Sequence, residues 1–499
     1  MKRTIKSISE VLKSHRLLLL KLLITLQIVF LGFLFFQAVA DGRYFLIHED
    51  EVINYCSAKV FSETGSVRAE SCISENVSRI GEMNWYGPGY SIMYGAMRLM
   101  FDQSPSLFIK IHFTFALITI ILILFFLPIS LEDRLLSGSI LIFTEQFTGY
   151  IFTYFPESFH LLIAVIFTLL IIKIHQSTDG NMKNRFIIIF IMLVIVVSLS
   201  RVTTIFWLAG LIGVSACRKE RKKMILVFAV GLVVILLFMR YFTAPPYAGG
   251  MQKIDRLFKL DILDFISKTV LSTLGNTFRL LKSSSIVVYI LLVLVIMAAV
   301  RWWQTKHQIL GAALLISISL LGALMAYYSA GEWYFLKQSA ILLPLLIISL
   351  ILTSSSQVFK YTILILSFLF FPLLYKNVSN SINEHKKAFQ ALQSYRSFQN
   401  ALNELPDFIS EQSNITILWL YTEYDFGSTT EAILPFSTKH GNPILYTTNI
   451  VSASDTPEVK FERFNKLKIN YVLSRTTLSL PHLQLVHATE FYNFYRIEK

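Results

Sequence analysis

The chain has 499 residues, of which 54% are hydrophobic and only 15% are charged, and its mean hydropathy is +0.58. So much apolar surface does not fit into one soluble core, which excludes an ordinary soluble enzyme and predicts a polytopic membrane protein. The net charge of +13 is distributed in short basic runs between apolar segments. Such runs are orientation signals of membrane proteins, so the charge does not indicate a nucleic-acid-binding protein.

Eleven apolar segments are predicted to span the membrane. The first follows a basic N-terminus and is too long for the core of a signal peptide, so we expect it to remain uncleaved. The third contains Thr144, Glu145 and Gln146 and has the weakest span pattern. The segments are residues 17–40, 106–128, 135–154, 158–174, 185–199, 202–216, 224–242, 285–302, 309–328, 336–353 and 358–375.

The basic runs predict which side of the membrane each loop faces. Positive charges lie on both sides of residues 185–216, so both flanks are expected in the cytoplasm and the segment is expected to be a hairpin. Ser200 and Arg201 then lie at its outer tip. With a cytoplasmic N-terminus, the loops 41–105 and 243–284 and everything after about residue 376 are predicted to lie outside.

The first outer loop, residues 41–105, contains an apolar stripe at helical spacing. It indicates either an amphipathic helix on the membrane surface or a helix packed within the loop. Cys56 and Cys72 are expected either to form a disulfide, if the loop faces an oxidising compartment, or to remain two free thiols. The stripe consists of Tyr90, Met93, Tyr94, Met97 and Phe101.

The tail after residue 380 changes to a mixed polar composition. The predicted fold class is therefore mainly α, with a transmembrane module at 1–378 and a small soluble α/β domain at 379–499 outside the membrane. Helices are predicted at 381–404 and 458–467, and strands at 415–421, 444–448, 470–474 and 491–497.

Three consecutive carboxylates, Glu49, Asp50 and Glu51, follow the first predicted span. Ionised groups close to a bilayer are costly unless they serve a purpose there, and such a cluster suits general-base catalysis. The alternative is a solvated acidic start of the outer loop. A further acid, Glu157, follows Pro156 at an outer junction. It either supports Asp50, holds a divalent cation with it, or is a carboxylate at a helix N-terminus.

Two basic residues on the predicted outer side are candidates for binding phosphate. Arg201 lies at the hairpin tip, and Lys337 follows the short late loop. A guanidinium matches the geometry of phosphate oxygens. The alternative for Arg201 is simple snorkelling of its side chain to the water interface.

Short motifs in chain order resemble those of the GT-C superfamily of membrane glycosyltransferases. The most similar branch is that of the protein O-mannosyltransferases and lipid A aminoarabinose transferases, close to glycosyltransferase family 39. Departures include Glu157, where many members carry Asp, and Trp333, where many carry Arg. The matching segments are residues 50–55, 62–65, 85–90, 97–101, 198–203, 331–334 with Pro344 beyond, 470–473 and 494–496.

The resemblance implies inverting transfer of a sugar from a polyprenyl-phosphate donor on the outer face of the bacterial inner membrane. By position, Asp50 would be the base and Glu51 its neighbour, and Arg201 and Lys337 would face the phosphate. The acceptor stays open between a glycan, a lipid and a protein. No cofactor is implied firmly, and a divalent cation held with Glu157 or Glu49 is left open.

Three other classes stay open. A transporter or flippase of lipid-linked glycans would need ionisable residues at mid-bilayer depth, for which Glu145 is the one candidate. A polysaccharide polymerase or ligase is expected to have a large loop late in the chain, whereas the late outer loop predicted here, residues 329–335, is short. A non-catalytic relative of the GT-C enzymes is the third.

Overall fold

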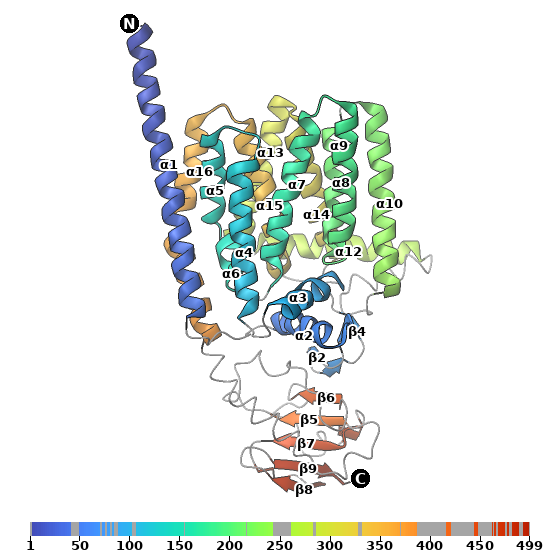
Figure 1. Ribbon diagram of the computed structural model, residues 1–499. Coiled ribbons are helices and arrows are strands. Elements are labelled where there is room, and N and C mark those ends of the chain that lie inside the picture. Colours follow the sequence, from blue (N-terminus) through green and yellow to red (C-terminus); the bar gives the residue numbers. More distant parts are fainter. Residues whose placement is uncertain are drawn as a thin grey trace. The chain divides into compact units, whose positions relative to one another are not determined.

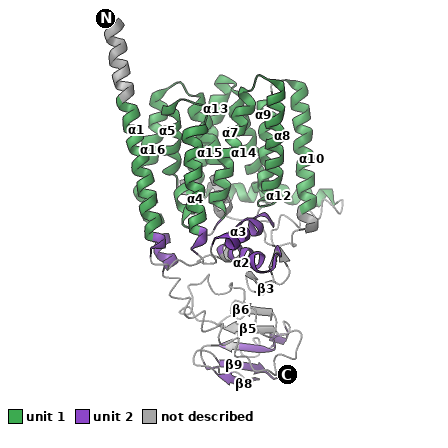
Figure 2. Ribbon diagram, in the orientation of Figure 1, with its two compact units in different colours: residues 1–37, 109–152, 156–379 green, residues 38–108, 153–155, 380–499 purple. Residues whose placement is uncertain are grey.

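A computed structural model describes most of the chain, which forms two compact units (Figures 1 and 2). Unit 1 comprises residues 1–37, 109–152 and 156–379, and unit 2 comprises residues 38–108, 153–155 and 380–499. The described residues are 2–40, 49–69, 72–74, 77–79, 82–83, 88–101, 106–153, 155–215, 217–242, 261–282, 286–327, 332–369, 371–386, 416–420, 444–447 and most of 462–498.

Unit 1 is a bundle of helices (Figure 1). After the last helix of the bundle, a further helix, residues 371–386, continues into unit 2. The helices are α1 (Lys2–Val39), α4 (Leu107–Ile121) with the π-helical turn η1 (Leu122–Phe126), α5 (Leu131–Ile142), α6 (Glu145–Ile151), α7 (Glu157–Gln176), α8 (Gly180–Ser198), the 3-10 helix η2 (Val202–Leu208), α9 (Ala209–Val214), α10 (Arg218–Phe242), α12 (Ile262–Leu281), α13 (Ile286–Thr305), α14 (Gln308–Tyr327), α15 (Glu332–Thr353) and α16 (Gln357–Leu369).

Six of these helices are long and apolar enough to cross a membrane, or seven if α16 and residues 371–386 form one bent span. Every predicted span overlaps helices among the described residues, so the polytopic helical class is confirmed, while the count of eleven stays a prediction. The third predicted span is two short helices, α5 and α6. The Thr144 hydroxyl accepts a hydrogen bond from Phe147 N and thereby starts α6 as a new helix.

Small residues allow close helix packing inside unit 1. A Cβ atom added to Gly213 in α9 would lie 2.4 Å from both N and Cα of Ala312 in α14. Two helix backbones approach this closely only where side chains are absent or small, which is a common basis of helix association in membranes. The short helix α9 is therefore fixed directly against α14.

The segment 243–284, predicted as an outer loop, contains a helix, α12, that the sequence pattern did not predict. It runs across the long helices of the bundle instead of alongside them (Figure 1). The side chain of Asn276 donates a hydrogen bond of 2.8 Å to the carbonyl of Met325 near the end of α14. The other side of the helix is apolar and exposed, with Ile262, Leu263, Ile266, Val270, Leu271, Leu274 and Phe278.

In unit 2, α2 (Glu49–Thr64) packs against α3 (Pro88–Met100). Tyr90 and Tyr94 of α3 stack on each other with ring centroids 4.3 Å apart, and both are buried. The apolar stripe therefore forms a packed helix, as one of the two alternatives predicted. Phe101 of the stripe is itself exposed, as are Ile92, Leu99 and Met100, so the other alternative, a helix on the membrane surface, stays a prediction.

Unit 2 also contains a seven-stranded sheet in the order β2-β3-β6-β5-β7-β9-β8, in which β2 and β3 come from the first loop and the other strands from the C-terminal segment. Strand β5 is parallel to β6 and β7, and the other pairs are antiparallel. The four strands predicted in the tail are present, and β8 was missed. The strands are β2 (Cys72–Ser74), β3 (Val77–Arg79), β5 (Thr416–Leu420), β6 (Ile444–Thr447), β7 (Tyr471–Ser474), β8 (Leu483–Ala488) and β9 (Asn493–Ile497), and a separate pair is β1 (Arg68–Ala69) with β4 (Glu82–Met83).

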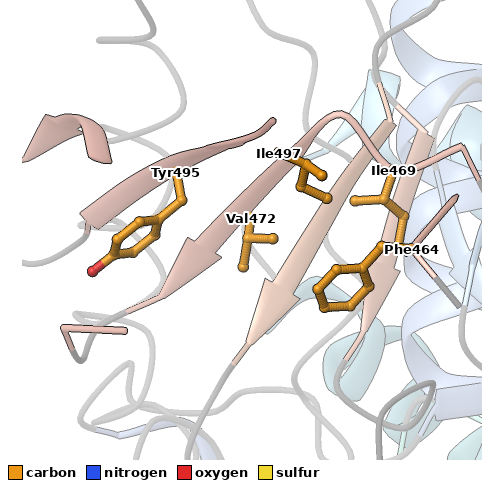
Figure 3. Packing of buried hydrophobic residues seen from close by; sticks show 5 residues of the cluster. All are labelled: Phe464, Ile469, Val472, Tyr495 and Ile497. Atoms are coloured by element: carbon orange, nitrogen blue, oxygen red, sulfur yellow. The ribbon is translucent and has the colours of Figure 1, made fainter. Parts of the chain in front are cut away.

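A small apolar core lies on one side of this sheet. Figure 3 shows side chains of β7 and β9 meeting residues from the segment before β7. The hydroxyl of Tyr495 accepts a hydrogen bond of 2.7 Å from Leu478 N, so the one polar atom of the cluster has a partner. The cluster consists of Phe464, Ile469, Val472, Tyr495 and Ile497.

Candidate functional site

The acidic cluster lies at the start of α2. Glu49 and Asp50 occupy the first turn of the helix, and their side chains lie outside the described part of the structure. The Glu51 side chain is described and is completely buried. A carboxylate in that position contradicts the alternative of a wholly solvated acidic loop, at least for Glu51.

Glu51 contacts a histidine that sequence analysis did not single out. Oε1 of Glu51 lies 3.2 Å from Nε2 of His385, which is also completely buried. His385 belongs to the helix of residues 371–386, and its Nδ1 lies 2.7 Å from the carbonyl oxygen of Ser381. The contact therefore joins α2 to the start of the tail, both within unit 2.

Arg201 and Glu157, both predicted as site residues, form an ion pair in unit 1. Nη2 of Arg201 lies 2.5 Å from Oε1 of Glu157. Arg201 is 4% exposed and Glu157 is fully buried, so Arg201 does not simply extend to water at the interface. Arg201 has an extended backbone just before η2, and Glu157 begins α7 after Pro156. The residue before η2 and the first residue of α7 therefore bring opposite charges together.

The pair has a further polar neighbour, a histidine of α7. His160 lies one turn after Glu157 in α7 and is buried. Among the residues that the structure describes, neither Oε2 of Glu157 nor Nε2 of His160 has a hydrogen-bond partner. Buried polar atoms are rarely left so, and this region is therefore suited to hold water or a polar group of a ligand. The three-residue spacing of Glu157 and His160 was a signal present in the sequence.

The remaining predicted residues are described only in part. Lys337 lies in α15, and its side chain is outside the described residues, as are the side chains of Cys56 and Cys72. In the described part of the chain, no three His, Cys, Asp or Glu side chains gather in a way that would hold a metal ion. The Glu51–His385 contact and the Arg201–Glu157 pair belong to different units, and each stands by itself.

Comparison with known proteins gives a fold. No protein-family model matches the chain, and no curated protein sequence does. The apo oligosaccharyltransferase of Archaeoglobus fulgidus aligns with a TM-score of 0.53 and 12% identity, over 90% of this chain and 69% of that chain. ArnT from Cupriavidus metallidurans, bound to undecaprenyl phosphate, aligns with a TM-score of 0.51 and 12% identity, over 95% of this chain and 97% of that chain. The chain therefore shares the fold of these two structures, which agrees with the resemblance drawn from its motifs.

Proposed function

We propose that the protein is an integral-membrane glycosyltransferase that moves a sugar from a polyprenyl-phosphate donor to an acceptor outside the membrane. One observation carries the proposal. The fold matches ArnT over nearly the full length of both chains, and ArnT was solved with undecaprenyl phosphate bound. The candidate spans agree with a donor whose lipid tail lies in the bilayer.

In the proposed reaction Asp50 is the general base. It takes the proton from the acceptor hydroxyl while that oxygen forms a bond to the anomeric carbon of the sugar. The bond from that carbon to the phosphate oxygen breaks, and the lipid phosphate leaves with the electron pair. The products are an inverted glycoside and free polyprenyl phosphate, and Asp50 holds the proton until solvent removes it.

Arg201 is proposed to stabilise the leaving phosphate, with Lys337 as a second cation. The guanidinium carries five N–H donors, so the contact of Nη2 with Glu157 does not use all of its capacity. Glu157 holds the guanidinium in one orientation and offsets its charge before the donor arrives. We therefore propose this role for Glu157 instead of direct support of Asp50, which was one of the alternatives drawn from the sequence.

The test is sugar transfer by purified protein in lipid vesicles, supplied with a panel of labelled polyprenyl-phosphate sugars. Asp50→Asn is compared with Glu63→Gln, a control on the same helix whose carboxylate is half exposed and 3.8 Å from Lys59. We expect transfer to disappear in the first variant and to persist in the second. A chelator added to the wild type tests the divalent cation.

The other outcomes assign the failure to a definite part of the proposal. Equal transfer by Asp50→Asn and wild type removes Asp50 as the base and directs the search to Glu49. No transfer by the wild type from any donor contradicts the proposed activity and favours a transporter or a non-catalytic relative.

A further inference from the structure

We propose that His385 is a positioning residue, which shares one proton with Glu51 and thereby fixes the first turn of α2. Asp50 lies in that turn. The part of this inference that concerns sugar transfer rests on the proposed function. The proton-sharing contact itself rests only on the geometry of the two side chains.

The proton follows from the two ring nitrogens of His385. Nδ1 lies 2.7 Å from the backbone carbonyl of Ser381, and a carbonyl oxygen only accepts hydrogen bonds, so Nδ1 carries a hydrogen. In a neutral imidazole Nε2 would then be an acceptor. It faces Oε1 of Glu51 at 3.2 Å, where an ionised carboxylate would also be an acceptor.

Two acceptors at hydrogen-bond distance need a proton between them. Either the ring is an imidazolium beside a carboxylate, or Glu51 is protonated and donates to Nε2. In both cases the pair carries one proton and no net charge. This state suits a site where both side chains are 0% exposed, because a single buried charge is costly without its partner.

The contact joins segments that are far apart in the sequence. Glu51 and His385 are separated by 334 positions, and the helix of residues 371–386 leads from the last span into the tail. Fixing the Glu51 side chain fixes the rotation of the first turn of α2, and with it the backbone of Asp50. A general base must be held in place to within a fraction of an ångström, so such a support acts on the reaction rate.

The test compares His385→Leu, His385→Gln and Ser381→Ala in vesicles under the assay for sugar transfer. Leucine removes the ring nitrogens, whereas glutamine keeps an N–H that donates to Glu51. The Ser381→Ala control removes a hydroxyl 3.5 Å from Nδ1 and leaves the carbonyl in place. We expect His385→Leu to lower kcat by about 10- to 100-fold with the donor KM unchanged. Glutamine restores most of this loss, and the control behaves as the wild type.

Wild-type kcat in His385→Leu, a change in KM alone, or no rescue by glutamine would overturn the inference. A Glu51→Gln variant adds a measurement that does not need activity. The thermal unfolding midpoint is compared for Glu51→Gln, His385→Leu and the double variant. If the two side chains share a proton, the loss in the double variant is smaller than the sum of the single losses. Additive losses would refute the contact, even if the protein transferred no sugar.

Asp50→Asn, measured alongside, keeps the two proposals apart. Retained transfer in Asp50→Asn together with lost transfer in His385→Leu would remove Asp50 as the base. It would also refute positioning of Asp50 by His385. Non-additive unfolding midpoints in that case would still establish the contact between Glu51 and His385.

Discussion

The buried pair of Arg201 and Glu157 gives a prediction that is independent of any substrate. Both side chains lie at 4% exposure or less, so solvent does not screen their interaction. Removing one partner leaves the other charge buried, which typically costs about 3–5 kcal/mol of folding free energy. Glu157→Met and Arg201→Met should each show a loss of this size. The double variant should lie close to the wild type, because an apolar replacement of both partners leaves no stranded charge.

The measurement is the free energy of unfolding of each variant in mixed micelles, titrated with a denaturing detergent. The ion pair of Lys183 and Glu220 is the matched control, since its atoms lie 3.2 Å apart but its side chains are 19% and 42% exposed. Removing either of these partners should cost at most about 1 kcal/mol. The reasoning would be refuted if the single Met variants lost as little unfolding free energy as the control variants. It would also be refuted if the two losses added up in the double variant.

Two further predictions concern the helix bundle. Gly213→Ala should destabilise the protein by about 1–3 kcal/mol, because the new Cβ would meet backbone atoms of α14 at 2.4 Å. Gly322→Ala in α14 meets nothing within 4 Å and should leave the unfolding midpoint unchanged or raise it. Burial, and secondarily a neighbouring histidine, lowers the pKa of His307 from its ordinary value of 6.5. The unfolded chain therefore binds the proton more readily, and stability should fall as the pH falls below about 6.5. The slope of the unfolding midpoint against pH between 7 and about 5 should be shallower in His307→Gln, and equal slopes would contradict the assignment.

The long apolar runs and the alternating strands were predictable from local pattern alone. Residues 106–128 and 158–174 correspond to α4 with η1 and to α7. These two segments were recognisable because a helix surrounded by hydrocarbon needs a continuous apolar sequence. The strand β7 was visible because Tyr471–Ser474 is short, β-prone and bounded by turn residues.

Other elements depend on contacts that no local pattern contains. The α12 helix is amphipathic, with one polar and one apolar side. Its average composition is therefore too polar for a predicted span, and its helical period was not recognised in the sequence. Strand β3 joins the tail sheet through one pairing, Val77 with Tyr446, which links positions far apart in the chain. Such pairings are set by tertiary structure.

The candidate site was likewise predictable from the sequence only in part. Glu157 and Arg201 were both singled out from their positions beside spans, but their mutual pairing required the fold. His385 carries no motif, and a lone histidine in a helix is not distinguishable by sequence from one that only packs. Its proximity to Glu51 depends on where the tail returns to the first loop.

The apolar side chains exposed on α12 determine whether this helix is more stable in water or in lipid. Leu263 is 82% and Leu271 is 67% exposed, while the opposite side is tied to the end of α14 through Asn276. An apolar side chain of this size loses roughly 1.5–3 kcal/mol when it faces water instead of hydrocarbon. Lipid therefore acts as part of the fold of α12, whereas the bundle core is covered by protein. When lipid is stripped away, α12 should open before the buried helices of the bundle, and its amide hydrogens should exchange before those of α7 or α14.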